Sequence, residues 1–174
     1  MSESVHKHRE SAPERVRVAV LTISDTRTPE TDTGGDAIEE LMRTAGHDVV
    51  RRGIVRDEPA RIRTELVDLL ASPDVDAVVT TGGTGISARD TTYEVVDRML
   101  DKKLDGFGEI FRVLSYEEIG AAAVLSRAVA GAVGTKLVAC LPGSRNAVRL
   151  AVEKLLVPEI AHIVFELKKH QEGS

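Results

Sequence analysis

The sequence predicts a three-layer α/β/α sandwich with a mostly parallel central sheet and a small antiparallel edge element. Short apolar runs of strand length alternate with longer amphipathic stretches, which is the order of elements in a parallel sheet covered by helices on both faces. Two further strand-length runs adjoin Gly134-Thr135, and this spacing is typical of an antiparallel pair.

Chain length and composition indicate a single globular domain. The chain has 174 residues, of which 42% are hydrophobic, and this is sufficient for a sizeable core. We assign residues 15–170 to this domain. Residues 1–14 lack apolar periodicity, so we expect them to form a disordered tail.

Charge and composition exclude several classes of partner. The formal net charge is −5 and aromatic residues make up only 3%, so we expect no nucleic acid and no acidic membrane surface as a partner. No apolar run approaches the roughly 18 residues of a membrane span and the N-terminus does not resemble a signal peptide, so we expect a cytoplasmic protein. Cys140 is the only cysteine, which excludes an intramolecular disulfide, and its apolar surroundings indicate a core residue.

The first strand is expected at residues 16–23, an almost continuously apolar run that suits a strand buried on both faces. It ends at Ser24-Asp25, and a polar loop with glycines follows. Asp36 and Glu39 have the spacing of a capping box, so we expect a helix to begin at Asp36 and to end at Gly46.

Asp57 precedes Glu58-Pro59 at the start of the next expected helix. An aspartate in this place is an ordinary N-cap, and the pattern alone favours capping over chemistry. Thr91 with Glu94, and Ser115 with Glu118, again have capping-box spacing, while Gly106–Glu109 is expected to interrupt the chain and Pro158 to break or kink the last helical stretch. The other expected elements are strands 48–55, 75–80, 126–133 and 136–141 and a short helix at 116–124.

The most informative stretch is residues 78–92, with the sequence VVTTGGTGISARDTT. A β-branched run gives way to three glycines, then to small hydroxyl residues and Arg89-Asp90. Glycines at the carboxyl end of a strand let the main chain approach a ligand and turn its N–H groups toward an anion. A structural turn would not require Thr81, Thr84 and the Arg-Asp pair as well, so we favour phosphate binding.

Polar loops follow the strands that end near residues 23, 80 and 141, and we expect them to converge at one sheet edge. Residues 83–88 formally match the dinucleotide motif G-x-G-x-x-A. That match is weak, because it follows a middle strand and no acidic residue ends a strand about 20 residues later. A nucleotide-dependent oxidoreductase is therefore the least favoured hypothesis for the function. A P-loop is excluded because no Gly-Lys-Ser or Gly-Lys-Thr is present.

Four segments together resemble the MoaB/MogA family of molybdenum cofactor biosynthesis proteins, the molybdopterin adenylyltransferases. In chain order they are 23–25 (ISD), 81–90 (TGGTGISARD), 106–109 (GFGE) and 141–144 (LPGS). The resemblance covers residues 16 to about 165, and the stretches 106–120 and 126–131 look most like the MoaB branch. Compared with a common family pattern, Ile86-Ser87-Ala88 replaces a stretch that often holds proline, and Arg145 follows the Pro-Gly-Ser.

The resemblance implies a MogA/MoaB-like fold and transfer of an adenylyl group from Mg-ATP to the terminal phosphate of molybdopterin, with release of pyrophosphate. Asp57 and Asp90 match the two aspartates that the family requires, so it implies that both are catalytic and hold Mg²⁺. A homo-oligomer, trimeric or hexameric, and a downstream molybdate-insertion protein are the implied protein partners. The implied binding residues are Ser24, Asp25, Thr81, Gly82, Gly83, Thr84, Gly85, Glu109, Pro142, Gly143 and Ser144.

The residue types suit this chemistry. A phosphate monoester is already an anionic nucleophile at pH 7, so the site must supply alignment and charge neutralisation rather than a strong base. The amides of Gly82–Gly85 are expected to cradle phosphate, and Arg89, Arg112, Arg127 and Arg145 are candidate local positive charges. Because some members of the MoaB branch are thought not to catalyse, a noncatalytic molybdopterin-binding or scaffold protein is the alternative.

Overall fold

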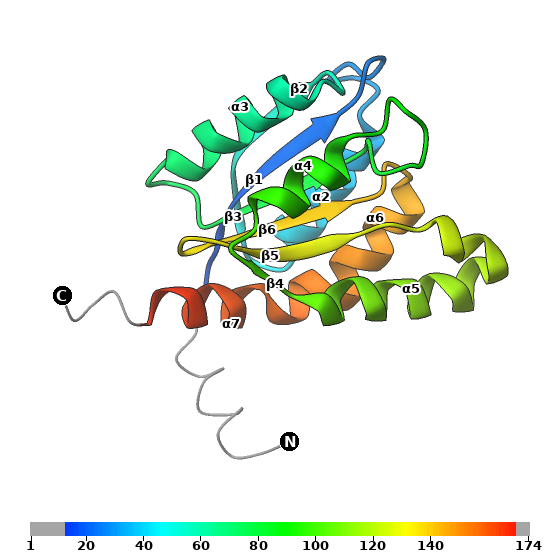
Figure 1. Ribbon diagram of the computed structural model, residues 1–174. Coiled ribbons are helices and arrows are strands. Elements are labelled where there is room, and N and C mark those ends of the chain that lie inside the picture. Colours follow the sequence, from blue (N-terminus) through cyan, green and yellow to red (C-terminus); the bar gives the residue numbers. More distant parts are fainter. Residues whose placement is uncertain (1–12, 170–174) are drawn as a thin grey trace.

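The computed structural model describes residues 13–169, so most of the predicted tail at 1–14 lies outside the described residues. These residues form a six-stranded sheet in the order β2-β1-β3-β6-β5-β4, with helices on both faces (Figure 1). The strands are β1 (Arg17–Ile23), β2 (Asp48–Val55), β3 (Ala77–Thr81), β4 (Lys102–Lys103), β5 (Val129–Val133) and β6 (Lys136–Leu141). The helices are α2 (Thr33–Thr44), α3 (Pro59–Ala71), α4 (Thr92–Met99), α5 (Asp105–Ile119), α6 (Arg145–Ala151) and α7 (Val157–Lys168), with a 3₁₀ segment at Gly120–Leu125 and a π-helical turn at Val152–Leu156.

The sheet confirms the predicted fold class. β2, β1, β3 and β6 run parallel, whereas β5 is antiparallel to both of its neighbours, β6 and β4. From β1 the chain passes first to β2 on one side and then to β3 on the other. The strand order therefore reverses between β1 and β3, and open α/β sheets bind ligands outside the carboxyl ends of the strands at such a point.

The two faces of the sheet bury separate apolar clusters, which explains the nearly continuous apolar strands. On β1, Val18 and Val20 pack toward α2, α5, α6 and α7, while Ala19 and Leu21 pack toward α3 and α4. Side chains alternate between the faces of a strand, so a strand covered on both faces needs apolar residues at every position. Cys140 is fully buried in the second cluster, and burial raises the pKa of its thiol to about 12, as expected for a core residue.

The predicted start of the first helix is wrong by one turn. α2 begins at Thr33, and its N-cap is Asp32, whose Oδ1 accepts a hydrogen bond from the Gly35 amide at 3.0 Å. The other carboxylate oxygen of Asp32 accepts from Thr22 Oγ1 at 2.8 Å and from Arg52 at 2.9 Å. Tertiary partners on β1 and β2 thus select Asp32 as the cap in place of Asp36.

Thr91 is the N-cap residue of α4, as its spacing predicts, but its side chain makes no capping hydrogen bond, and the capping box predicted at Ser115 is wrong. Ser115 lies buried inside α5, which begins ten residues earlier, at Asp105, and runs straight through the glycine-containing segment. A Cβ on Gly108 would lie 2.7 Å from the carbonyl oxygen of Ala128, so this glycine allows the first turns of α5 to pack directly on β5. Tertiary packing outweighs the low helix propensity of glycine here.

The last helical stretch also differs from the expectation at Pro158. The helix does not break at the proline. A π-helical turn at Val152–Leu156 precedes it, and α7 starts at Val157 with Pro158 in its first turn. A wider turn places the proline where no intrahelical N–H is needed.

A buried ion-pair network anchors the end of the sheet opposite to the polar loops. Asp76 accepts hydrogen bonds from the main-chain and side-chain nitrogens of Arg17 at 2.9 to 3.0 Å and a further one from Lys168. Burial alone would raise the pKa of Asp76, but the hydrogen bonds from Arg17 and Lys168 outweigh it and hold that pKa well below its usual range. The network joins β1, the entry to β3 and α7.

We expect Asp76→Asn to lower the free energy of unfolding at pH 7 by about 2 kcal/mol, because it removes charge-assisted hydrogen bonds. Since the carboxyl pKa is lowered in the folded state, its contribution is present above the unfolded pKa near 4 and is lost as the pH falls below that value. Denaturant titrations at several pH values should therefore show the two proteins converging in acid. Asp74→Asn, at an exposed carboxylate 3.8 Å from Arg17, is the control and should change little.

Gly82 sits at the switch point with a φ of +97°, where its main chain meets that of Ile23. A Cβ at this position would lie 2.2 Å from the carbonyl oxygen of Ile23, so no other residue fits without moving β1 from β3. The glycine is therefore needed both for its conformation and for the contact.

We expect Gly82→Ala to destabilise the fold by about 3 kcal/mol or more, from backbone strain together with the clash. Gly46→Ala is a matched control, because Gly46 also has a positive φ, +88°, but no atom lies within 4 Å of its Cβ position. Its cost should be about 1 kcal/mol, from strain alone. Equal losses for both variants in thermal or denaturant unfolding would show that the contact with Ile23 contributes nothing.

Candidate functional site

The three polar loops converge at the carboxyl edge of the sheet, as the sequence predicts. The Gly82 amide donates to the carbonyl oxygen of Leu141 at 3.1 Å, and Thr81 Oγ1 donates to that of Pro142 at 2.8 Å. Gly143 packs on Gly82, with its Cβ position 3.2 Å from the Gly82 Cα. The loops after β3 and β6 are thus joined to each other and to the end of β1.

A cavity of about 90 Å³ opens at the switch point between β1 and β3, and we call it the cradle. Ser24, Arg27, Thr81, Gly82 and Gly143 are among its lining residues. Ser24 Oγ accepts from the amides of Thr26 and Arg27, so its own proton remains available to a ligand. Asp32 also lines the cradle, but its carboxylate is already bound by Thr22, Gly35 and Arg52, so hydroxyl groups and a guanidinium remain around a space that suits a phosphate group.

Two aspartates from separate elements flank the glycine loop. Asp57 follows β2 and Asp90 precedes α4, yet both carboxylates lie against the glycine main chain. A Cβ on Gly83 would be 2.4 Å from Asp57 Oδ2, and one on Gly85 would be 2.6 Å from Asp90 Oδ2. The glycines therefore make room for the two carboxylates, and the structure places at one loop the pair that the family resemblance implies.

Asp57 does not cap α3, which corrects the reading that the sequence pattern favoured. The residue before Pro59 in the cap position is Glu58, and its side chain makes no capping bond. Asp57 Oδ1 instead accepts from Thr91 Oγ1 at 2.8 Å and from the Thr91 amide at 3.3 Å, across to the start of α4. This side chain points toward the glycine loop.

The carboxylates repel one another. Burial raises the pKa of Asp57, hydrogen bonds from Thr91 oppose that rise, and the negative charges of Asp90 and Asp25 raise it further. Asp25 accepts from the Asp57 amide at 3.3 Å and is paired with Arg89, whose guanidinium lowers the pKa of Asp25. Arg89 is thus bound to a carboxylate of the site, and a cation between Asp57 and Asp90 would relieve their repulsion.

Three consecutive amides of the glycine loop are available for a ligand. The expectation for Gly82 is wrong, since its N–H already donates to Leu141. Among residues 13–169, the N–H groups of Gly83, Thr84 and Gly85 have no acceptor. The buried hydroxyl of Thr92, which lies against Gly83, likewise has no partner within this range. Unpaired donors beside two carboxylates suit a phosphate together with its cation.

In the described part of the chain, no three His, Cys, Asp or Glu side chains are arranged as a metal-binding group. That is compatible with Mg²⁺, which proteins hold through one or two carboxylates together with waters and substrate phosphates. Asp57 and Asp90 supply hard oxygen ligands of the required kind. Their mutual repulsion is the feature of this structure that fits a divalent cation.

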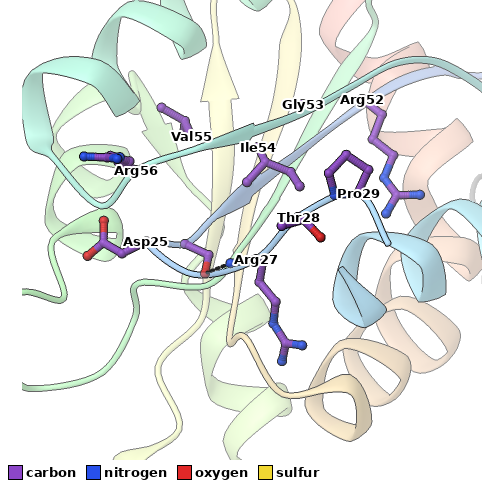
Figure 2. Close-up of a pocket in the computed structure, with 10 residues that line it drawn as sticks. Asp25, Arg27, Thr28, Pro29, Arg52, Gly53, Ile54, Val55 and Arg56 are labelled. Carbon is purple, nitrogen blue, oxygen red and sulfur yellow. Dashed lines mark hydrogen bonds between the residues drawn. The ribbon is translucent and has the colours of Figure 1, made fainter. Parts of the chain in front are cut away.

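Two larger cavities flank the cradle and the loop. One, of about 560 Å³, lies between α5 and α6, and its lining combines Thr84, Ser144 and Arg145 with apolar Ile119 and Leu125. The other, of about 720 Å³, lies beside the edge strand β2 (Figure 2). Neither Asp57 nor Asp90 lines these two cavities; both carboxylates lie at the glycine loop, against Gly83 and Gly85.

Some other residues predicted for the site lie away from the glycine loop or make structural contacts such as helix caps and ion pairs. Glu109 is on α5 and lines a separate cavity with Arg112, so the chain does not bring it to the glycine loop. Ser144 lines the α5–α6 cavity and also caps α6, where its Oγ accepts from the Ala147 amide at 3.3 Å. Arg127 pairs with Glu94 and stacks on Tyr93, as an ordinary ion-paired arginine would.

Some residues at this edge were not singled out from the sequence. Arg27 lines the cradle, and Arg56 stands next to Asp57 and lines the cavity beside β2. The sequence signal that could have identified them is their position directly after the ends of β1 and β2. Charged residues are common in loops, so only the fold distinguishes them from solvated ones.

The helices in the described range are too short or too polar to cross a membrane.

The family model and the most similar curated proteins point to the same family. Residues 19–162 match the family model described as "Probable molybdopterin binding domain". The Molybdenum cofactor biosynthesis protein B of Bacillus cereus is 50% identical over 167 residues, which cover 95% of this chain and 99% of the relative. That of Bacillus subtilis is 46% identical over 167 residues, covering 95% and 98%.

Solved structures agree with the sequence matches. The tungsten cofactor synthesizing protein MoaB from Pyrococcus furiosus superposes with a TM-score of 0.81 at 38% identity, covering 90% of this chain and 99% of that one. A crystal structure of a Molybdenum cofactor biosynthesis protein B superposes with a TM-score of 0.89 at 50% identity, covering 92% and 100%. The chain therefore belongs to the MoaB/MogA family of molybdenum cofactor biosynthesis proteins, and within it to the MoaB branch.

Proposed function

We propose that the protein catalyses Mg-ATP-dependent adenylylation of molybdopterin, giving adenylylated molybdopterin and pyrophosphate. The observation that carries the proposal is the pairing of Asp57 and Asp90 across the glycine loop, next to the unpaired amides of Gly83–Gly85. Two carboxylates with no cationic partner between them, beside free N–H donors, favour a site that takes a polyphosphate with its metal ion.

The reaction needs alignment more than acid–base catalysis. A terminal phosphate oxygen of molybdopterin attacks the α-phosphorus of ATP, a new P–O bond forms, and the bond from that phosphorus to the bridging oxygen breaks as pyrophosphate leaves. Mg²⁺, when bound by Asp57 and Asp90, would supply neutralisation of phosphate charge. The amides of Gly83–Gly85 hold phosphate oxygens, while Ser24 and Arg27 fix a phosphate in the cradle.

The α5–α6 cavity is the place we assign to the pterin. Ser144 and Arg145 offer polar contacts, whereas Ile119 and Leu125 cover the flat faces of a ring system. Pro142 and Gly143 connect this cavity to the cradle, so a ligand bound in the first would place its phosphate in the second.

We further propose that the protein is a homo-oligomer, a trimer or a hexamer. Support comes from the outer face of α5, where Ile110, Val113, Tyr116 and Ile119 are 52% to 63% exposed. Residues three apart are neighbours on a helix surface, so these four side chains form an apolar stripe that winds around the exposed side of α5, and exposed apolar surface of this kind marks protein contacts. A downstream molybdate-insertion protein that receives the adenylylated product completes the proposed set of partners.

We expect Asp57→Asn and Asp90→Asn each to lower pyrophosphate release at least about 100-fold, because each removes charge that aligns and neutralises the reacting phosphates. The measurement is pyrophosphate produced from molybdopterin, ATP and Mg²⁺ by the purified protein. Asp68→Asn, at an exposed site on α3, is the matched control and should retain full activity. Molybdopterin binding by the wild type without pyrophosphate release would instead support the noncatalytic scaffold.

The oligomer makes a separate prediction. We expect Val113→Asp to shift the protein toward monomers in light-scattering measurements, because a charge in the centre of an apolar contact must be desolvated without a partner. Val67→Asp, at a solitary valine of α3 that is 47% exposed, should leave the mass unchanged. A wild type that is already monomeric would contradict this part of the proposal.

A further inference from the structure

A group of positive charges lies at the amino end of the sheet, opposite to the glycine loop. Arg17 begins β1, Lys136 begins β6 and Lys168 ends α7, so three separate elements bring cations to one place. The guanidinium of Arg17 and the ammonium group of Lys168 both bind the carboxylate of Asp76. None of these residues takes part in the reaction proposed above.

The carboxylate of this group is covered, whereas its cations reach the surface. The side chain of Asp76 is 6% exposed, while those of Arg17 and Lys168 are 40% and 42% exposed. Asp74 also lies near Arg17, at 3.8 Å, but its side chain is 71% exposed, so water screens this pair. A small anion that arrives from solvent therefore meets Arg17 and Lys168 before it meets Asp76.

Lys136 differs from the other two cations in its partner. Its Nζ donates to the main-chain carbonyl oxygen of Ser72, the residue at the carboxyl end of α3. Within residues 13–169, its ammonium group forms no ion pair with a carboxylate. The side chain is half-buried, so a reagent in solvent still reaches it. The amine is thus held in one place without a counter-charge of its own.

This environment disfavours the charged form of Lys136. Burial lowers the pKa of its amine, and the positive charges of Arg17 and Lys168 lower that pKa further. The charges of Asp76 and Asp74 oppose this effect without outweighing it. More of the amine is therefore neutral at a given pH than in an ordinary lysine. The neutral amine is the nucleophilic form, and desolvation beside other cations is a known way to activate it.

An activated amine with cations beside it suits an acyl donor whose leaving group is an anion, and acyl phosphates are of this kind. The neutral Nζ attacks the acyl carbon, an N–C bond forms, and the bond from that carbon to the phosphate oxygen breaks. The phosphate leaves with the electron pair of that bond, and the nitrogen gives its extra proton to water. Arg17 and Lys168 neutralise the charge that gathers on the departing phosphate.

We propose that Lys136 is an acylation site, which takes the acyl group of a small acyl phosphate while Arg17 and Lys168 bind the phosphate. The acylated side chain loses its positive charge but keeps one N–H for the carbonyl oxygen of Ser72. Asp76 keeps its bonds to both cations, so the fold accepts the modification. The site is independent of the glycine loop and of the function proposed above.

Mass spectrometry that resolves individual lysines, on the full-length protein treated with acetyl phosphate, tests the proposal. Lys154 is the comparison within the same molecule, because it is an exposed lysine in the π-helical turn. Lys136 should be acetylated at least about fivefold faster than Lys154, since more of its amine is neutral and the phosphate is bound beside it. Because its pKa is lowered, its rate should also level off at a lower pH. Equal rates at the two lysines would overturn the proposal.

A neutral reagent, the N-hydroxysuccinimide ester of acetic acid, separates phosphate binding from the reactivity of the amine. The preference for Lys136 over Lys154 should be at least about threefold smaller with this ester, which has no phosphate to bind. The same preference with both reagents would reject the role of Arg17 and Lys168.

Lys168→Gln tests the neighbouring charge. It should slow the acetylation of Lys136 by acetyl phosphate at least about threefold, because it removes both a like charge and a phosphate contact. Lys169→Gln is the matched control, since Lys169 is the exposed lysine directly after α7, and it should react as the wild type does. Far-ultraviolet circular dichroism checks that both variants are folded. An unchanged rate in folded Lys168→Gln would contradict the proposal.

Discussion

The close approach of Gly82 to the carbonyl oxygen of Ile23 is the contact on which the ligand-binding edge depends. It holds the ends of β1 and β3 together at the point where the strand order reverses, and the Gly82 amide then ties the loop after β6 to the same place. The Gly82 amide is used in this structural hydrogen bond, so the next three amides of the loop, those of Gly83, Thr84 and Gly85, remain available to a ligand. One tight main-chain contact thus both holds the sheet edge together and positions the amides that we propose bind phosphate.

Close to this contact, negatively charged side chains repel one another. Asp57 is buried beside Asp90 and Asp25, and within residues 13–169 Asp25 alone of the three has an arginine partner, Arg89. A protein that needed these residues only for stability would pair all of them or replace them with apolar groups. Two carboxylates without a cationic partner at a loop with free amides are electrostatically unfavourable, and the cation and phosphates of the proposed reaction would relieve this repulsion.

The family assignment and the geometry address different parts of the function. Matches along nearly the whole chain establish a molybdenum cofactor biosynthesis protein. The two cavities that flank the cradle support the proposed reaction, because a group transfer between two phosphate-bearing substrates needs both reacting phosphates at a single place. Ser24 and Arg27 line both the cradle and the cavity beside β2.

The sequence by itself determined the α/β class, the mostly parallel sheet with an antiparallel pair at its edge, and the position of the glycine loop after a strand, because apolar periodicity and glycine clusters depend on neighbours along the chain. It did not determine the caps. Asp32 replaces Asp36 because of partners on β1 and β2, and Asp57 turns to Thr91, 34 residues away, in place of its own helix. Only the tertiary structure decided which polar groups are already satisfied, and therefore which ones remain for a ligand, because hydrogen-bond partners are set by distance in space and not along the sequence.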